Sequence, residues 1–149
     1  MAGPALGAEL RALMTERLHR AGQRVTANRE TLVAVLAAAG RPLTIPEIIE
    51  AAGTLAQSSA YRNLQALEQA GLVHRIVTND DFARYELAED LTEHHHHLIC
   101  RSCGTVEDVP AAPGLERSVR AAADAIARDT GFHTQHHRVD LLGLCRRCA

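Results

Sequence analysis

Four cysteines form two matched pairs. Cys100 and Cys103 are separated by two residues, as are Cys145 and Cys148, and 41 residues lie between the pairs. Such a pair directs two thiolates at one ion, and two pairs complete the tetrahedral four-sulfur shell that zinc accepts. A redox pair or two disulfides would use the same residues, but paired knuckles without a thioredoxin-like context favour zinc. Because protein ligands fill all four positions, the site is expected to be structural.

A run of four histidines, His94 to His97, leads directly into Leu98-Ile99-Cys100. Its internal position and its continuity with an apolar segment argue against a purification tag, whereas a solvated loop is an alternative interpretation. Successive side chains of a strand point to opposite faces, so His94 and His96 face one way and His95 and His97 the other. One strand then supplies a pair of imidazoles to each of two separate metal sites.

Each histidine pair needs ligands from elsewhere in the chain. Glu116, at a helix start, and His137, on the last strand, suit one site, and His74 and Glu86, on two earlier strands, suit the other. The latter site would join two parts of the molecule through one ion, which lets a metal control their relative position. Spacing alone does not assign these four partners, and a single histidine such as His74 is more often a surface residue than a ligand.

The first half of the chain has the pattern of a winged helix-turn-helix. Helical spacing and end signals predict four helices: one ended by Gly22, one from Thr26 to Gly40, one opened by the capping box Thr44-Ile45-Pro46-Glu47, and one capped by Ser58 or Ser59 and ended by Gly71. Strands follow at residues 72–78 and 82–87, around a turn at Asn79-Asp80-Asp81.

The fourth helix is the one expected to enter the DNA major groove, because it is the second of two close helices before a hairpin. Its apolar face carries Ala60, Leu64 and Leu67. Its opposite face carries Ser59, Arg62, Asn63 and Ala66.

The second half of the chain is expected to form a small mixed domain. Residues 88–93 are polar and acidic and are interpreted as a hinge. A strand through residue 100, a turn at 102–104, a strand at 105–110, a helix at 115–130 and a strand at 132–144 should follow. The fold class is therefore α+β, with a winged-helix DNA-binding domain at residues 1–87 and a small α/β domain with the four-cysteine zinc site at residues 94–149.

Charge is unevenly distributed, although the formal net charge of the 149 residues is only −2. Residues 1–78 hold eight arginines and six acidic residues, and residues 79–149 hold eight arginines and twelve acidic residues. The more basic half is the one with the DNA-binding pattern.

No apolar run approaches the roughly 18 residues of a membrane span. The N-terminal segment lacks the apolar stretch of a signal peptide, so a cytoplasmic protein without a membrane partner is expected.

Together these motifs resemble the ferric uptake regulator family, which contains iron, zinc, manganese, nickel and peroxide sensors. The matching segments are Gly22-Gln23-Arg24-Val25-Thr26 with Arg29, Tyr61-Arg62-Asn63-Leu64, His94 to Gly104, and Gly131-Phe132 with His137 to Cys148. The resemblance implies a homodimeric repressor that binds a palindromic double-stranded DNA operator when metal-loaded and releases it when metal is scarce. Residues 94–149 would then be the dimerisation domain.

The resemblance also implies a role for each group of candidate residues. The structural zinc ligands would be Cys100, Cys103, Cys145 and Cys148. A sensory site at the hinge would use His74, Glu86, His95 and His97. A second site, in the dimerisation domain, would use His94, His96, Glu116 and His137. Positions that touch DNA in the family are occupied by Arg24, Tyr61 and Arg62, and Ser59 and Asn63 share their helix.

The regulatory ion is expected to be zinc or ferrous iron. His74 favours zinc, and with it the zinc uptake regulator branch, because zinc-sensing relatives place a ligand near this position. The absence of a cysteine from the second wing strand favours iron. A peroxide sensor or a sensor of another metal in the same family is the alternative.

Two functions of other classes fit the sequence less well. A zinc enzyme needs an open metal position and an acid–base partner, and the sequence contains no H-E-x-x-H motif. A metal buffer would leave the DNA-binding half without a role. The chain is therefore predicted not to be an enzyme.

Overall fold

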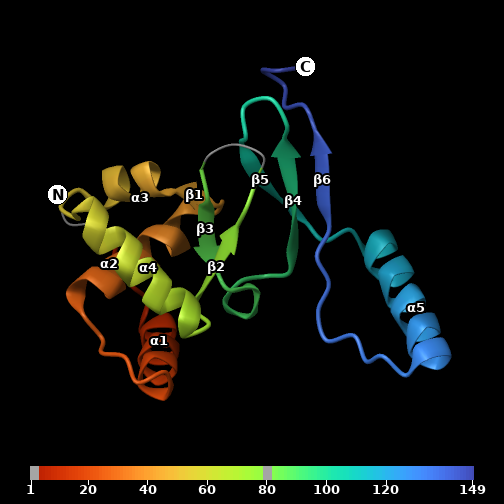
Figure 1. The fold of residues 1–149 in the computed structure, drawn as a ribbon, viewed down its shortest axis with the longest axis horizontal. Helices are drawn as coiled ribbons and strands as arrows, with labels where there is room; N and C mark the ends of the chain where they lie inside the picture. Colours follow the sequence, from red (N-terminus) through yellow and green to blue (C-terminus); the bar gives the residue numbers. More distant parts are fainter. Residues whose placement is uncertain (1–3, 79–81) are drawn as a thin grey trace.

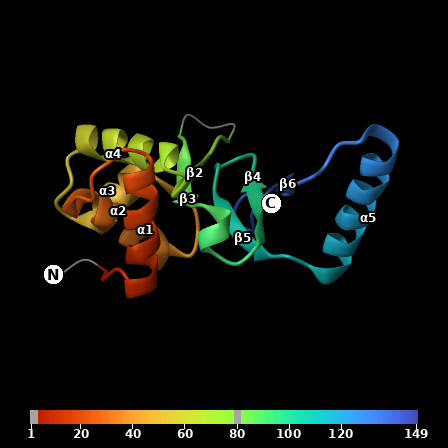
Figure 2. The ribbon, with the colours of Figure 1, turned by 90° about the horizontal axis from the view of Figure 1, so that it is seen from below.

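The N-terminal half packs helices against a small antiparallel sheet (Figures 1 and 2). The computed structural model describes residues 4–78 and 82–149. The elements of this half are α1 (Ala8–Arg20), α2 (Ala27–Ala39), β1 (Leu43–Thr44), α3 (Ile45–Ala52), α4 (Gln57–Gln69), β2 (Val73–Ile76) and β3 (Arg84–Leu87). The four predicted helices are confirmed. The predicted turn at Asn79, Asp80 and Asp81 lies outside the described residues.

Side-chain caps fix the starts of α2 and α3. The Thr26 side chain accepts a hydrogen bond from the Arg29 amide at the start of α2. Thr44 and Glu47 form a complete capping box at the start of α3, in which each side chain satisfies a backbone amide of the other residue. Both caps follow the sequence signals.

The start of α4 differs from the prediction that Ser58 or Ser59 caps it. The Ala60 amide donates to the Ala56 carbonyl at 2.9 Å, so the helix already begins at Gln57. Both serines therefore lie in its first turn, where the Ser59 hydroxyl accepts hydrogen bonds from other side chains instead.

The core of this half lies between the helices and the sheet. Its fully buried side chains include Met14, Leu18, Ile48 and Leu64. Ala66, expected on the outer face of α4, is buried at 7 % exposure because α4 packs against both α2 and α3.

The sheet has the order β1-β3-β2 and carries the wing. The β2–β3 ladder runs from Val73 opposite Leu87 to Ile76 opposite Arg84, so both strands are shorter than predicted. Three close-packed helices followed by this antiparallel pair make a winged helix-turn-helix, which confirms the predicted α+β fold.

The C-terminal half is built on a mixed sheet of order β5-β4-β6. The 3-10 turn η1 (Glu89–Leu91) connects the two halves, and the elements of this half are β4 (His95–Cys100), β5 (Val106–Pro110), α5 (Pro113–Thr130) and β6 (Asp140–Gly143). β4 pairs antiparallel with β5 and parallel with β6. The last strand was predicted to span residues 132–144 and is shorter, because its ladder with β4 extends only from Asp140 to Gly143.

This half leaves much apolar surface exposed. In both views α5 stands apart from the rest of the molecule, connected through the chain segments at its two ends (Figures 1 and 2). The exposed large hydrophobic side chains here include Leu115, Ile126, Phe132, Leu141 and Leu142. An apolar surface of this kind indicates a protein partner. Among the described residues, no helix is both long and apolar enough to span a bilayer.

Candidate metal centres

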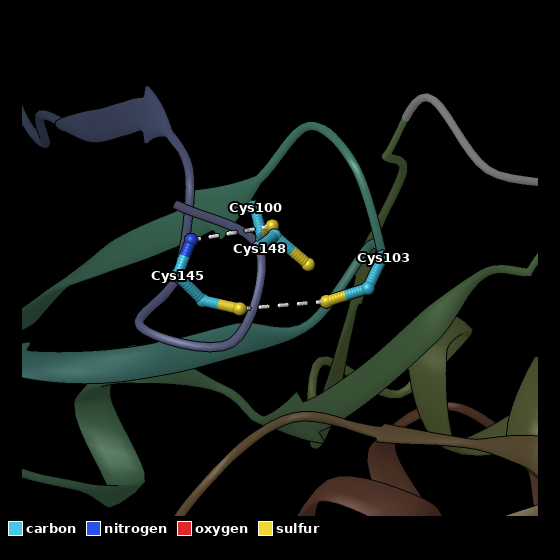
Figure 3. A group of neighbouring side chains, drawn as sticks. All are labelled: Cys100, Cys103, Cys145 and Cys148. Atoms are coloured by element: carbon cyan, nitrogen blue, oxygen red, sulfur yellow. Dashed lines mark hydrogen bonds between the residues drawn. The ribbon is translucent and has the colours of Figure 1, made fainter.

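The four cysteines converge at one end of the β4–β6 pair (Figure 3). Their four sulfur atoms lie within 4.8 Å of one another. Cys100 ends β4, Cys103 lies in the turn that follows, and the other two lie in the turn after β6. The Cys103 and Cys145 sulfurs are 3.7 Å apart, and the Cys145 amide donates to the Cys100 sulfur at 3.3 Å. All four are free thiols, so the geometry is that of one four-sulfur cation site.

The thiols of this cluster differ in acidity. Backbone hydrogen bonds from Cys103 and Cys145 lower the pKa of Cys100 to about 6. A hydrogen bond with Ser102 acts to lower the pKa of Cys148, but the neighbouring thiols Cys145 and Cys103 outweigh it and raise that pKa to about 11. The Cys100 thiolate therefore forms most readily, and a cation would stabilise the charged form of the thiols beside it. The cluster thus fits a zinc ion, as the sequence predicted.

A second group of candidate ligands lies beside α5 and consists of His94, His96, Glu116 and His137. The His94 Nε2 atom lies 3.1 Å from Glu116 Oε2 and 3.0 Å from His137 Nε2. The His96 Nε2 atom lies 2.5 Å from Glu116 Oε1. The hydrogen bond with His96 lowers the pKa of Glu116. The structure brings together the four residues that the resemblance implied for this site.

A third group faces the N-terminal half and consists of Glu86, His95, His97 and Asp108, whose ligand atoms lie within 4.8 Å of one another. Glu86, on β3, approaches His95 Nε2 to 3.1 Å and His97 Nε2 to 3.0 Å. Asp108, on β5, lies 3.8 Å and 3.7 Å from the same two nitrogens. We call this group the hinge site because its ligands come from both halves of the chain.

The charges of the hinge site suit a cation. Burial acts to raise the pKa of Glu86, but hydrogen bonds and charge interactions with His97 and His95 outweigh it and hold that pKa below its ordinary value. Burial raises the pKa of Asp108. For His95 and His97, burial is outweighed by the nearby oxygen atoms, and the pKa of each imidazole is raised. The Glu86 carboxylate is thus stabilised in its charged form, which is the form that binds a divalent ion.

His74 is adjacent to the hinge site but is not part of the group. It pairs with Glu86 across the β2–β3 ladder, and both residues line a cavity of about 330 Å³ together with His95 and His97. Burial is the main cause that lowers the pKa of His74. Its Nε2 atom and the Asp108 Oδ1 atom are buried without a hydrogen-bond partner in the described part of the chain. An ion at the hinge site would satisfy the Asp108 atom, which lies 3.7 Å from His97 Nε2.

Asp108 is the candidate ligand that the sequence analysis missed. The signal was present in the predicted hairpin around residues 102–104. Antiparallel pairing across that turn places Asp108 opposite His97, as the structure shows. The two adjacent acidic residues of the 105–110 strand, Glu107 and Asp108, did not by themselves single it out.

In three of the four histidines of the run His94 to His97, the ring nitrogen that faces away from the ligand group contacts an oxygen atom. The Nδ1 atom of His95 lies 2.8 Å from the Glu93 carbonyl, and that of His97 lies 3.2 Å from Asp140 Oδ1. The Nδ1 atom of His94 contacts the Glu89 carboxylate. Such outer contacts place the proton on Nδ1 and leave Nε2 to bind a metal, which is the usual arrangement of metal-binding histidines.

The candidate DNA-contact residues are four residues of α4 and Arg24, which precedes α2. They fall into two groups. Tyr61 is 53 % exposed, and Arg62 is exposed beside it, as is Arg24 before α2. Asn63 is half-buried and already engaged, since its side chain accepts from Arg29 Nε at 3.0 Å and donates to the Ser59 carbonyl at 2.9 Å. Asn63 and Ser59 therefore brace α4 against α2, while the other three side chains face outward.

The sequence was compared with known proteins. The model of the ferric uptake regulator family matches residues 20–142. The peroxide operon regulator of Bacillus subtilis is 29% identical over 138 residues, which cover 90% of each chain. The ferric uptake regulation protein of the same organism is 29% identical over 139 residues, 89% of this chain and 90% of that protein.

The fold was compared with solved structures. A zinc-bound manganese uptake regulator is 31% identical, covers 91% of this chain and 98% of its own, and superposes with a TM-score of 0.64. The ferric uptake regulator of Helicobacter pylori, which has three functional metal-binding sites, covers 99% of this chain and 97% of its own with a TM-score of 0.73. At 24% identity this second likeness shows the fold alone.

Proposed function

Because the chain belongs to the ferric uptake regulator family of metal-responsive transcriptional regulators, we propose that it is a metal-dependent DNA-binding repressor controlled through its hinge site. Its relatives are regulators and not enzymes. The observation that carries the proposal is the position of Glu86, a wing residue, within 3.1 Å of imidazoles that belong to the C-terminal sheet. Residues 1–87 act as the DNA-binding domain, residues 88–93 as the hinge, and residues 94–149 as the dimerisation domain.

The hinge site controls the orientation of the DNA-binding domain. Without an ion, Glu86 and the imidazoles are joined only by hydrogen bonds that water can replace. With a divalent ion, Glu86 and Asp108 share its charge, and the wing is fixed against the C-terminal sheet. A dimer must hold its two recognition helices about 34–36 Å apart to match two half-sites of DNA. A fixed wing increases the population that meets this requirement and therefore raises affinity.

The regulatory ion is zinc or ferrous iron, with manganese as a further candidate. The sequence favoured zinc through His74 and iron through the absence of a cysteine from the second wing strand. Asp108 adds a second carboxylate, and mixed oxygen and nitrogen ligands suit iron and manganese as well as zinc. The 31% identity to a zinc-bound manganese uptake regulator supports the same range of ions. The similarity to the peroxide operon regulator makes a peroxide response of an iron-loaded hinge site the second candidate function.

The remaining sites support this role. A structural zinc ion at Cys100, Cys103, Cys145 and Cys148 would join the end of the chain to β4. The exposed apolar side chains of α5 and β6 would be covered by the second subunit of a homodimer. A second regulatory ion would lie between His94, His96, Glu116 and His137, where all four ligands belong to the dimerisation domain.

Metal-dependent selection of DNA tests the function. The protein, stripped of regulatory metal but retaining its cysteine-bound zinc, is incubated with random duplex DNA in the presence of Zn²⁺, Mn²⁺ or anaerobic Fe²⁺. We expect at least one ion to enrich a palindromic sequence, and the ion that acts at the lowest free concentration identifies the metal. Failure of all three ions to enrich any sequence would contradict the repressor assignment. Release of the DNA by hydrogen peroxide only when iron is bound would support the peroxide response.

Arg62→Ala is expected to weaken DNA binding without changing metal content. Arg62 is exposed on the face of α4 that carries Tyr61, where its guanidinium can reach phosphate or the edge of a guanine. A phosphate contact predicts a loss on all sequences and a salt slope that is smaller by about 1. A guanine contact predicts a loss of about 1–3 kcal/mol that is confined to the selected sequence.

The matched control for this variant is Arg128→Ala. Arg128 is exposed in the last turn of α5, which lies at the opposite end of the molecule from α4 (Figure 1). Fluorescence anisotropy of a labelled duplex at several salt concentrations compares the two. Equal affinity of the two variants would place the DNA-binding surface elsewhere.

A further inference from the structure

The turn η1, between the wing and β4, is held firmly on the N-terminal half. Both terminal guanidinium nitrogens of Arg17, on α1, donate to the Asp90 carboxylate. The Ala88 amide donates to the Leu72 carbonyl at 2.9 Å, and Leu91 packs against the hydrophobic core of this half. The first part of the 88–93 hinge is therefore held on the DNA-binding domain and is not a free linker.

Glu89, the residue next to Asp90, contacts the other half of the molecule. The Glu89 carboxylate contacts Nδ1 of His94, while Nε2 of the same ring faces Glu116 and His137 in the second ligand group. The His94 ring thus lies between η1 and the second site. Two adjacent carboxylates, Glu89 and Asp90, reach the two domains from one short turn.

We infer that Glu89 is a positioning residue that couples occupancy of the second metal site to the orientation of the DNA-binding domain. This inference rests on the proposed function. When Nε2 of His94 is a metal ligand, the ring proton is on Nδ1 and donates to the Glu89 carboxylate, as in other metal-binding histidines. The His94 ring is then held by the ion on one side and by Glu89 on the other. Because Glu89 belongs to η1, the turn is held in place as well. The second site thereby acts on DNA affinity although none of its ligands belongs to the N-terminal half.

This contact is distinct from the hinge site. The hinge site holds the wing through Glu86 on β3, whereas the second site holds the domain through η1 and the Arg17–Asp90 ion pair on α1. Two separate contacts restrain rotation of one domain against the other more than either does alone. Filling the second site should therefore add to the affinity that filling the hinge site provides.

A double-mutant cycle in the full-length dimer tests this coupling. His96→Ala empties the second site without touching the contact between His94 and Glu89, and Glu89→Ala removes that contact. DNA affinity at saturating Zn²⁺ is measured for wild type, both single variants and the double variant. We expect His96→Ala to lower affinity about 5- to 150-fold, the usual range of allosteric coupling. In the Glu89→Ala background we expect His96→Ala to have no further effect, because the route is already broken.

Zinc binding provides an independent readout that does not involve DNA. Glu89→Ala should weaken zinc binding at the second site about 10- to 100-fold, the usual cost of losing an outer carboxylate. Glu89→Gln should restore most of the affinity, since its side-chain oxygen still accepts from Nδ1. Asp124→Ala, which removes the same charge from an exposed position of α5, is the matched control and should leave zinc affinity unchanged.

Two outcomes would overturn the inference. One is unchanged zinc affinity at the second site in Glu89→Ala. The other is a double variant whose loss of DNA affinity equals the sum of the losses in Glu89→Ala and His96→Ala, in a protein whose wild type still responds to Zn²⁺. If wild type binds DNA equally with and without metal, the proposed function fails instead, and zinc affinity alone then decides whether Glu89 positions His94.

Discussion

Cys100→Ser is expected to remove one zinc ion per chain and to unfold the C-terminal half of the molecule. Structural zinc contributes an apparent free energy of about 10–16 kcal/mol in small zinc domains. This is as large as the whole stability of a typical domain, about 5–15 kcal/mol. Cys100 also accepts the hydrogen bond that brings the Cys145 turn onto β4. Loss of this sulfur ligand therefore frees the end of the chain and β6, the edge strand that carries exposed apolar residues.

Three measurements check this result: zinc per chain, amide hydrogen exchange of β4 to β6, and sedimentation. The expected outcome is one ion fewer, fast exchange throughout the C-terminal half, and loss of the dimer. Arg146→Ala is the matched control, because this exposed residue lies in the turn between Cys145 and Cys148 and its loss keeps all four sulfur ligands. A Cys100→Ser protein that retains wild-type zinc content and remains a folded dimer would show that the cysteine cluster is not a structural metal site.

His95→Ala is expected to abolish metal-stimulated DNA binding while the cysteine-bound zinc and the dimer stay intact. Its Nε2 atom lies 3.1 Å from Glu86 and 3.8 Å from Asp108, so the variant removes a central donor of the hinge site. Loss of an outer-contact residue alone costs about 10- to 100-fold in metal affinity. Loss of a ligand should cost at least about 100-fold.

His133→Ala is the matched control, because this exposed imidazole lies outside the ligand groups of the described residues. Metal content, dimer mass and DNA affinity are measured for both variants at the same free Zn²⁺ or Fe²⁺ concentration. We expect His133→Ala to behave as wild type. If His95→Ala still gains DNA affinity with either metal as wild type does, the hinge site is not the sensor.

Features that depend on neighbours in the sequence were predicted correctly. Within each cysteine pair a short turn directs both sulfurs at one point, and the pairing of β4 with β6 then brings the two pairs together. The alternation of the histidine run follows from strand geometry, and the structure separates His94 and His96 from His95 and His97 as predicted. The capping box of Thr44 and Glu47 is likewise a local signal.

Several features that depend on tertiary contacts were not predicted. Asp108 joins the hinge site through the register of a hairpin, which the sequence alone does not state residue by residue. The start of α4 lies at Gln57 and not at the serines, and the Ser59 hydroxyl is engaged with Asn28 on α2 and with Asn63 one turn further along α4. Glu89 was assigned only to a polar hinge, since its contact with His94 requires η1 to be folded onto the N-terminal core.

The central claim is that occupancy of the hinge site determines DNA affinity. The most direct test measures, in the same samples, the anisotropy of the selected labelled duplex and the zinc bound per chain across buffered free Zn²⁺ concentrations. The protein begins with only its cysteine-bound zinc. We predict that DNA affinity rises with the hinge-site ion in wild type and stays at the metal-free level in His95→Ala. Full DNA affinity in wild-type protein that carries only the cysteine-bound zinc would contradict the claim.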